Sequence, residues 1–317
     1  MRVLFASMAT PGHTYPLIPL AQAMRKAGHE VHFAVGEDMH PVLGKLGLRP
    51  FRPGLVFGEI YAEDIAQELE RLLPDLVIGE WAVPEVVSEA RRRGFPALWH
   101  GFGRMFPEGI GLVRPTGGRH LDICPPSLQD PGFLKEDRIP LRAVPYSPPG
   151  HVPDRTAGKL VYLTLGTAFG TRELLAEAVV GLGRLTEAQV VVAAPHVELG
   201  NLPPNVTVHP WLPQAEVLRY ADVAVHHGGS GTMLGALVAG VPQVVLPQGA
   251  DQSGNADALV AAGAALRPGA FSAGPIVDCV RRLFADSSFR EAAGQIAREI
   301  RHTPSPEEVA DSLAGVV

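Results

Sequence analysis

Three groups of residues in the second half of the chain have the types and spacing needed to hold a nucleotide-sugar. Trp211 precedes a turn and offers an aromatic face on which a base can stack. Residues 226–232, His-His-Gly-Gly-Ser-Gly-Thr, form a glycine-rich turn into a helix, where exposed N–H groups and the helix dipole favour a phosphate. Asp251 and Gln252 open the next helix and could bind sugar hydroxyls.

The glycine-rich turn alone does not identify a phosphate site, because small residues also suit ordinary connections between a strand and a helix. The apolar run 223–225 predicts a buried strand before the turn. Residues 233–239 predict a helix that Ser230 or Thr232 would cap. His227 could donate a charge-assisted hydrogen bond to a phosphate oxygen. Since the other two groups lie close by in sequence, we interpret the whole region as one binding site.

A histidine in the first half is a candidate general base. His13 follows the first predicted strand, in a Pro-Gly-His loop that enters a helix. An imidazole of ordinary pKa, near 6.5, accepts a proton at neutral pH, although a lone loop histidine is more often structural. His100 and Arg104 follow a later strand, where they could line a second substrate's pocket or serve the structure alone.

Predicted strands and helices alternate along the chain. The first half is expected to contain strands 2–7, 30–35, 74–79 and 97–100, and helices 16–27 and 83–93. A proline-rich stretch, 144–153, interrupts this alternation and is typical of a linker. The second half is then expected to contain strands 160–165, 189–194, 206–208, 223–225 and 243–246, helices 172–185, 214–220 and 255–262, and a short final helix.

This alternation predicts an α/β fold of two doubly wound, Rossmann-like domains facing across a cleft. We expect a first domain over residues 1–147, a linker over 148–158, a second domain over 159–303, and a C-terminal helix over 304–317 that packs back on the first domain. Ligands of such sheets bind beyond the carboxyl ends of the strands. The candidate residues come just after predicted strands and are therefore expected at those edges.

Composition limits the function classes. With 317 residues, 46% of them hydrophobic and 19% charged, the chain has the profile of a globular protein of about two domains. A formal net charge of −6 argues against non-specific nucleic-acid binding. Cys124 and Cys279 stand far apart, outside any metal-ligand cluster, which favours a reducing compartment. The chain shows neither a signal-peptide core nor a long apolar run, so we expect a cytoplasmic protein without membrane contact.

These motifs resemble the donor-binding signature of the family 1 glycosyltransferases. The His-His-Gly-Gly-Ser-Gly-Thr form and the Pro-Gln-Gly-Ala-Asp-Gln form are similar to those of bacterial antibiotic glycosyltransferases, and the likeness extends to the opening residues 1–21. The resemblance implies a GT-B fold. In that fold the first domain binds mainly the acceptor and the second binds the nucleotide-sugar donor.

The family pattern also implies a role for each matched donor residue. Trp211 would stack on the pyrimidine, with Gln214 beside it, and Asp251 and Gln252 would bind the sugar. The diphosphate would be held by residues of two turns, namely Thr167, His227, Gly229, Ser230, Gly231 and Thr232. From the sequence alone, Thr167 is equally well placed to cap the following helix.

By the same resemblance, His13 is the catalytic base. The carboxylate that orients such a histidine is an Asp in relatives, and its place here falls on Glu80. Because Glu is one methylene longer, Glu80 could instead contact the acceptor or lie in a solvated loop. Attack by the activated acceptor is a single displacement, which predicts inversion at the anomeric carbon. The chain has no Asp-x-Asp pair for Mg²⁺, so we expect no metal and no other cofactor.

The donor nucleotide is predicted from one difference between this sequence and the family pattern. Plant members carry a Glu for the ribose hydroxyls three residues after the position of Thr232, where this chain has Gly235. A site that lacks this hydrogen-bond acceptor fits a deoxyribose, so a dTDP-sugar is favoured over a UDP-sugar. The expected acceptor is a small hydroxylated natural-product aglycone. The sugar, the atom glycosylated and the oligomeric state, a homodimer included, stay open.

Other functions remain as alternatives. One is a UDP-sugar transferase of the same fold, including one that acts on a lipid-linked acceptor. Another is a non-catalytic helper, although a helper is expected to lose the donor residues present here. An NAD-dependent oxidoreductase is disfavoured because the first turn, 6–13, lacks Gly-x-Gly-x-x-Gly. Residues 53–74 and 104–122 are also compact compared with the acceptor-covering insertions usual in the family.

Overall fold

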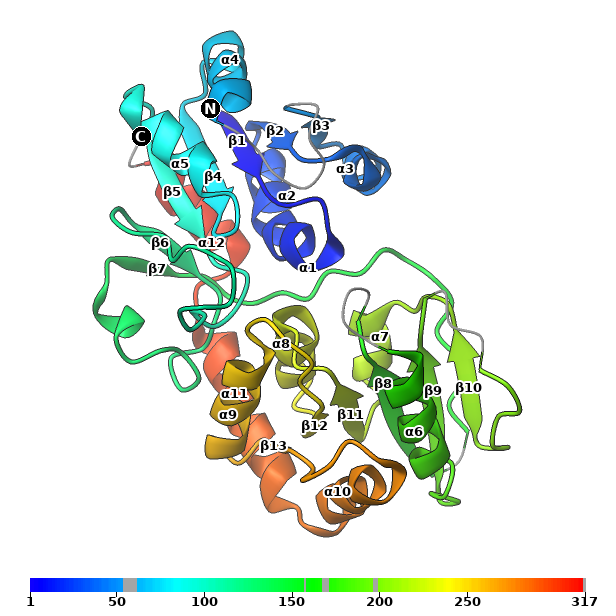
Figure 1. Ribbon diagram of the computed structural model, residues 1–317. Coiled ribbons are helices and arrows are strands. Elements are labelled where there is room, and N and C mark those ends of the chain that lie inside the picture. Colours follow the sequence, from blue (N-terminus) through cyan, green and yellow to red (C-terminus); the bar gives the residue numbers. More distant parts are fainter. Residues whose placement is uncertain (54–61, 157, 167–170, 196–198, 316–317) are drawn as a thin grey trace. The chain divides into compact units, whose positions relative to one another are not determined.

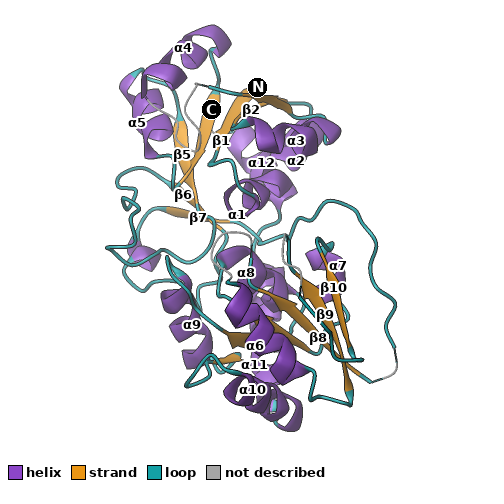
Figure 2. Ribbon diagram, turned by 45° about the vertical axis from the view of Figure 1, so that its right-hand side comes forward, coloured by secondary structure: helices purple, strands orange, loops and turns teal. Residues whose placement is uncertain are grey.

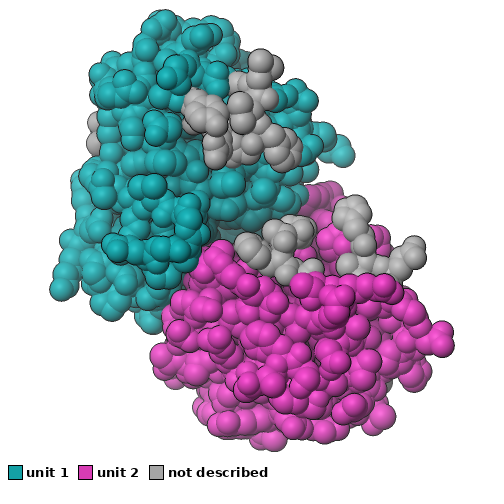
Figure 3. Space-filling model, in the orientation of Figure 1, with its two compact units in different colours: residues 1–146, 301–317 teal, residues 147–300 magenta. Residues whose placement is uncertain are grey.

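The computed structural model describes residues 1–53, 62–156, 158–166, 171–195 and 199–315. They form two compact units, each built around one parallel sheet (Figure 1). Unit 1 comprises Met1–Tyr146 and Arg301–Val317, and unit 2 comprises Ser147–Ile300 (Figure 3). The predicted pair of doubly wound α/β domains is confirmed.

The sheet of unit 1 has the strand order β3-β2-β1-β4-β5-β6-β7, and all its pairings are parallel. Its strands are β1 Arg2–Ala6, β2 Glu30–Ala34, β3 Arg49–Phe51, β4 Leu76–Glu80, β5 Ala97–His100, β6 His120–Asp122 and β7 Arg138–Pro140. The chain runs outward from β1 to β3 and then returns to place β4 on the other side of β1. The carboxyl ends of β1 and β4 therefore form a topological switch point, where ligands of such sheets bind.

The helices of unit 1 cover this sheet. They are α1 Pro11–Thr14, η1 Tyr15–Leu17, α2 Ile18–Lys26, η2 Glu37–Met39, α3 His40–Lys45, α4 Ala62–Leu72, α5 Pro84–Arg92, η3 Phe133–Lys135 and α12 Pro306–Ala314. The helix expected from residue 16 begins at Ile18, because Pro16 and Pro19 lack the N–H that continues a helical hydrogen-bond ladder. Helix α12 starts with a capping box between Ser305 and Glu308, and it packs on α2.

The sheet of unit 2 has the order β10-β9-β8-β11-β12-β13, again with parallel pairings (Figure 2). Its strands are β8 Lys159–Thr164, β9 Ala188–Ala193, β10 Val206–His209, β11 Val223–His226, β12 Gln243–Val245 and β13 Ala265–Leu266. Alternate residues of β8 point to opposite faces, so Val161 and Leu163 enter one buried cluster while Leu160 and Tyr162 enter another. The second switch point lies between β8 and β11.

Helices cover both faces of this second sheet. They are α6 Arg172–Leu182, α7 Gln214–Leu218, α8 Ser230–Val238, α9 Gln252–Ala261, α10 Ala273–Ala285 and α11 Ser288–His302. Neither Ser230 nor Thr232 caps α8, because the helix already begins at Ser230 and Gly229 is its N-cap. Helix α9 begins three residues before the expected Asn255, with Asp251 at its N-cap.

The expected linker, 148–158, belongs structurally to unit 2. The Ser147 hydroxyl accepts a hydrogen bond from the Ala215 N–H (3.1 Å) at the start of α7. Further along, the Thr156 N–H and hydroxyl both donate to Gln189 Oε1 (3.0 and 3.1 Å). The chain returns to unit 1 at Arg301, near the end of α11, so the boundary expected at residue 303 falls slightly earlier.

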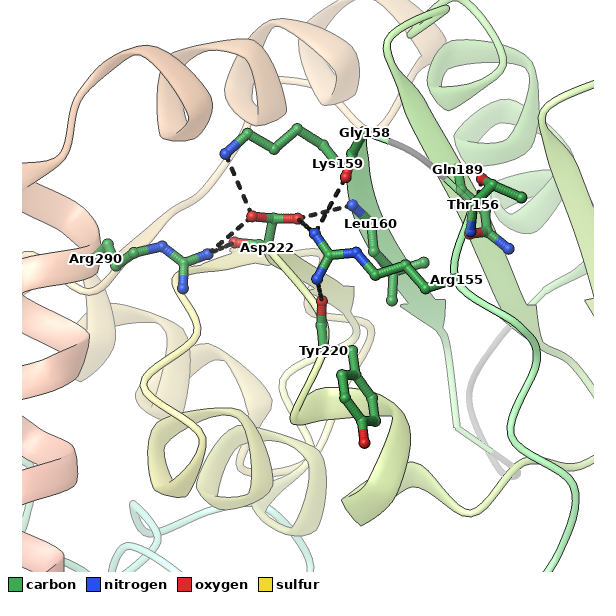
Figure 4. Close-up of polar contacts among 9 residues, drawn as sticks. All are labelled: Arg155, Thr156, Gly158, Lys159, Leu160, Gln189, Tyr220, Asp222 and Arg290. Carbon is green, nitrogen blue, oxygen red and sulfur yellow. Dashed lines mark hydrogen bonds and ion pairs between the residues drawn. The ribbon is translucent and has the colours of Figure 1, made fainter.

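A polar hub centred on Asp222 fastens this segment to the amino-terminal edge of the sheet (Figure 4). The Asp222 carboxylate accepts hydrogen bonds from the Leu160 N–H (2.9 Å), Arg155 (3.1 Å) and Lys159 (3.3 Å). Arg290 of α11 donates to the Asp222 carbonyl (2.7 Å). The hub therefore joins the linker, β8, the start of β11 and α11 through one residue.

Candidate active site

The first switch point brings His13 and Glu80 together. Nδ1 of His13, in α1 just after β1, lies 3.0 Å from Oε1 of Glu80, the last residue of β4. The same carboxylate oxygen accepts a hydrogen bond from the Ala82 N–H (3.0 Å). Since an ionised carboxylate only accepts hydrogen bonds, the proton of a neutral His13 belongs on Nδ1, and Nε2 is the basic nitrogen.

Burial and packing hold this pair in place. The Glu80 side chain is wholly buried, whereas that of His13 is 23% exposed, so only the imidazole reaches solvent. The imidazole also packs edge-on against Phe102, with 4.9 Å between ring centroids. Within the described chain, Oε2 of Glu80 has no hydrogen-bond partner. A buried carboxylate beside Nδ1 is an arrangement that orients a histidine for base chemistry.

His100 and Arg104, the two candidate acceptor-binding residues, both form hydrogen bonds within unit 1. His100 pairs with Glu80 in the strand register but is fully buried, and its Nδ1 donates to the Gly101 carbonyl (2.7 Å). Burial lowers its pKa to about 4, so the ring is neutral at physiological pH, and its part in binding the acceptor stays a prediction. Arg104 directs its guanidinium to the carbonyls of Leu128 (3.0 Å) and Met105 (3.3 Å), so it braces a loop. A further role in binding the acceptor stays a prediction.

In unit 2 the glycine-rich turn follows β11 at the second switch point. The imidazole of His227 lies between two glycines, since a Cβ added to Gly166 would be 2.7 Å from the ring and one added to Gly229 would be 2.4 Å from it. Nδ1 of His227 has no hydrogen-bond partner among the described residues. Desolvation lowers the His227 pKa, while Asp251 and the backbone of Thr164 act in the opposite direction. Any side chain at either glycine would displace this histidine.

The groups of α8 that are suited to bind a phosphate are its first backbone N–H groups. The first N–H groups of a helix, here those of Ser230, Gly231 and Thr232, have no carbonyl partner within it. The Thr232 hydroxyl is already used, because it donates to Oε1 of Gln214 (3.0 Å), which also accepts from Tyr162 (3.3 Å). Oε1 of Gln214 therefore joins the side chains of β8 and α8.

A hydrogen-bonded network joins the turn to the Asp-Gln pair. The Asp251 carboxylate accepts from the Ser230 hydroxyl (3.0 Å) and from the amide of Asn255 (2.9 Å) through the same oxygen. Asn255 also donates to the Gly228 carbonyl (2.9 Å). These contacts connect the start of α8 to the start of α9. The sequence analysis missed Asn255, although its position four residues after Asp251, one turn along a helix, was a usable signal.

Gln252 shapes the loop before the helix. Its Oε1 accepts hydrogen bonds from the N–H groups of Gln248 (2.7 Å) and Gly249 (3.2 Å), and the side chain is buried. Ala250, within this loop, has a φ of +51°, in the left-handed region that costs energy for any residue with a Cβ. The side chain of Gln252 thus stabilises a strained approach to Asp251.

Trp211 lies just after β10 with its indole 45% exposed. Gly150 packs against the indole so closely that an added Cβ would lie 2.4 Å from Cζ3. An exposed aromatic face with a firm backing suits a stacked base. Thr167, the other predicted diphosphate contact, lies outside the described residues.

The described ranges hold neither a metal-binding cluster nor a membrane-spanning helix. These ranges contain no cluster of three or more His, Cys, Asp or Glu side chains that could hold a metal ion. No helix among them is long and apolar enough to cross a bilayer.

Comparisons with known proteins define the class. Residues 176–316 match the family model described as the C-terminal domain of erythromycin biosynthesis protein CIII-like proteins. Elloramycin glycosyltransferase ElmGT of Streptomyces olivaceus is 30% identical over 382 aligned positions, covering 99% of this chain and 97% of that protein. L-demethylnoviosyl transferase of Streptomyces niveus is also 30% identical, over 99% of this chain and 98% of its own length.

Among solved structures, spinosyn rhamnosyltransferase SpnG complexed with thymidine diphosphate superposes with a TM-score of 0.84, 26% identity and coverage of 99% of this chain and 100% of that one. The protein is therefore a GT-B glycosyltransferase in fold. It belongs to the bacterial natural-product group of the family 1 glycosyltransferases.

Proposed function

We propose that this glycosyltransferase moves a sugar, in particular a deoxysugar, from a dTDP-sugar to a hydroxyl of a small natural-product aglycone, with inversion and without a metal. The observation that carries the proposal is that, in each sheet, groups suited to this chemistry follow the carboxyl ends of the strands. Unit 1 offers the pair His13 and Glu80. Unit 2 offers Trp211, the glycine-rich turn and Asp251.

The base step follows from the His13–Glu80 geometry. Nε2 of His13 takes the proton of the acceptor hydroxyl, and the oxygen then forms a bond to the anomeric carbon. The buried carboxylate of Glu80 stabilises the imidazolium as it forms, because it accepts the hydrogen bond from Nδ1 (3.0 Å). Since the acceptor attacks as the diphosphate leaves, one displacement occurs and the anomeric configuration inverts.

Departure of the diphosphate needs positive charge or donors at its oxygens. The first N–H groups of α8, the dipole of this helix and the His227 imidazole supply them, so the proposal requires no metal and no organic cofactor. Gly228 and Gly229 allow phosphate oxygens to approach the backbone. The bond from the anomeric carbon to the diphosphate breaks, and the nucleoside diphosphate leaves as an anion held by this turn.

The choice of dTDP is supported by two observations. Position 235 in α8 is a buried glycine, so no carboxylate stands there to accept a ribose hydroxyl. SpnG was also solved with thymidine diphosphate and, separately, with spinosyn aglycone. A UDP-sugar remains the second candidate, because Gln214 and Trp211 would hold either pyrimidine.

A thermal-shift titration with dTDP, UDP and NAD⁺ tests the donor site, since a ligand that binds the native state stabilises it by RT ln(1 + [L]/Kd). We expect dTDP to raise Tm more than UDP does. Stabilisation by UDP alone would change the proposed donor from a dTDP-sugar to a UDP-sugar. Stabilisation by NAD⁺ alone would reject the proposal. No response to any nucleotide would favour the non-catalytic helper. Turnover of a dTDP-sugar with hydroxylated polyketides, with and without EDTA, then tests metal independence, and the anomeric coupling constant of the product tests inversion.

A further inference from the structure

His226, directly before His227, is buried and contacts the glycine-rich turn at Gly228. It is the last residue of β11 and is fully buried. Its Nδ1 lies 3.0 Å from the Gly228 N–H, and its Nε2 lies 2.6 Å from Oε1 of Gln243 in β12. The Gln243 amide nitrogen donates in turn to the Met233 carbonyl of α8 (3.4 Å). The four groups form one buried chain that links a strand, the turn, the next strand and the helix.

Both ends of this series of hydrogen bonds are backbone groups, so the direction of donation is determined at each step. The Gly228 N–H can only donate, which makes Nδ1 of His226 an acceptor and places the ring proton on Nε2. Nε2 then donates to Oε1 of Gln243, and the amide nitrogen of Gln243 points to the Met233 carbonyl, which can only accept. Desolvation lowers the His226 pKa to about 3, so the ring stays neutral at physiological pH.

The peptide groups of Gly228 need such support. Its φ is +97°, which residues with a Cβ rarely adopt, and an added Cβ would lie 3.0 Å from both the Gln252 carbonyl and Val245. The N–H of Gly228 is held by His226 and its carbonyl by Asn255 (2.9 Å). The next residue, Gly229, is the N-cap of α8, so this fixation sets the direction of the N–H groups that begin the helix.

We propose that His226 is a positioning residue that preorganises the diphosphate-binding turn through the Gly228 N–H. The proposal rests on the proposed function, because it assumes that the turn binds a nucleoside diphosphate. His226 itself does not touch the ligand. Its contribution is to keep the turn in the binding conformation before the ligand arrives, which lowers the cost of ordering on binding.

Two near-isosteric variants separate the two ring nitrogens. In His226→Asn the side-chain oxygen takes the place of Nδ1 and still accepts from Gly228, whereas the link to Gln243 is lost. In His226→Gln the amide nitrogen takes the place of Nε2 and keeps that link, whereas Gly228 loses its acceptor. Gln243→Leu is the matched control, since it breaks the same buried chain but leaves the bond between His226 and Gly228 intact.

Calorimetric titration with dTDP and urea unfolding are measured for each protein. We expect His226→Gln to weaken dTDP binding by roughly 10-fold, the effect of leaving one N–H unpaired, and the other two variants to stay within about 3-fold of wild type although all three lose stability. A loss of affinity that follows the loss of stability across the three variants would show a purely structural role and overturn the proposal. If the wild type binds dTDP and His226→Gln binds it equally well, only this inference fails. If the wild type binds neither dTDP nor UDP, the proposed function fails as well.

A measurement on the wild type covers the case in which His226→Gln does not fold. Amide hydrogen exchange at Gly228, followed by NMR without nucleotide, reports whether the N–H is already bonded. Slow exchange supports the preorganised turn. Exchange at the rate of an open loop overturns the proposal.

Discussion

Nδ1 of His13 lies 3.0 Å from Oε1 of Glu80, although 67 positions separate the two residues in the chain. The contact exists because β1 and β4 are parallel neighbours and both residues come at their carboxyl ends. The hydrogen bond from the Ala82 N–H holds the Glu80 carboxylate beside the imidazole. This pair is the basis of the first prediction.

Replacing His13 by Ala should lower kcat by roughly 10²–10⁴-fold, the usual contribution of a general base, and leave dTDP affinity unchanged. Glu80→Gln should keep the hydrogen bond but lose the charge that stabilises the imidazolium, so kcat should fall by less. Single-turnover rates and dTDP titrations on both variants check this. Normal turnover by His13→Ala would exclude His13 as the base.

Trp211→Ala should weaken dTDP binding by roughly 1–3 kcal/mol, the scale of stacking between a base and an aromatic ring. Trp211→Phe should restore part of the loss. Gly150→Ala provides an indirect test, because its Cβ would lie 2.4 Å from the indole and displace it. We expect weaker binding from this variant too, measured by titration. Tyr220→Ala, an exposed aromatic elsewhere in unit 2, is the control and should change nothing.

Asp251→Asn should discriminate the sugar from the nucleotide. The variant keeps an oxygen for Ser230 and Asn255 but replaces the second carboxylate oxygen by an amide. We expect KM for the nucleotide-sugar to rise by about 10-fold or more, because a hydrogen bond to a charged group is lost, and Kd for dTDP to change little. Equal losses for both ligands would place Asp251 in the diphosphate site instead.

Asp222→Ala should lower the free energy of unfolding by roughly 1–3 kcal/mol, because the Leu160 N–H and three cations lose their common acceptor. The side chain of Asp222 is only 16% exposed. Asp257→Ala removes an ion pair with Arg267 whose acidic side chain is 74% exposed, and it should cost less than about 0.5 kcal/mol. Urea unfolding of the two variants gives the comparison. Equal effects would mean that the hub adds no more than a surface pair.

Acid should destabilise the fold well above the range in which carboxylates titrate. Burial lowers the pKa of His100 and His120 to about 4 and that of His226 to about 3, against about 6.5 in the unfolded chain. Below pH 6.5 the unfolded chain binds protons that the native state does not, so the free energy of unfolding falls as pH drops, by at most about 1.4 kcal/mol per pH unit for each histidine.

Urea unfolding at pH 7.5 and pH 5.0 measures this effect. Glu30 and Asp286, whose pKa values are lowered by hydrogen bonds to His32 and Ser288, lose their contribution only at more acidic pH. Burial raises the pKa of Asp122, so its protonation as pH falls acts against the effect of the histidines. A midpoint that is unchanged or higher at pH 5.0 would contradict the burial of these rings as neutral groups.

The sequence predicted the positions of the candidate groups better than their orientations. Alternating strands and helices place His13 and Glu80 at the same edge of a parallel sheet, so their meeting could be anticipated. Whether a strand residue faces the interior depends on what packs against it. His226, the last residue of β11, is fully buried, whereas the adjacent His227 follows the strand and is half-buried. Nothing in the local sequence tells which of the two is buried.

Loop contacts were the least predictable part. The Arg104 side chain donates to the carbonyl of Leu128, 24 positions away, and no local pattern encodes that contact. Phe102, which packs against His13, shows no sequence signal beyond its place after β5. Asn255 differs, because its distance from Asp251 matches a helical turn, and a helix assigned from Asp251 onward would have revealed it.

The return of the chain to unit 1 after Ile300 has a consequence for synthesis on the ribosome. Unit 2 is one continuous segment, whereas unit 1 is interrupted and needs α12 to cover α2. Domains fold as units while the chain emerges. The second unit can therefore complete its fold while the first, although made earlier, still exposes an uncovered helix. Ribosome-bound chains ending near residue 300 should contain a protease-resistant second unit beside an unfinished first one.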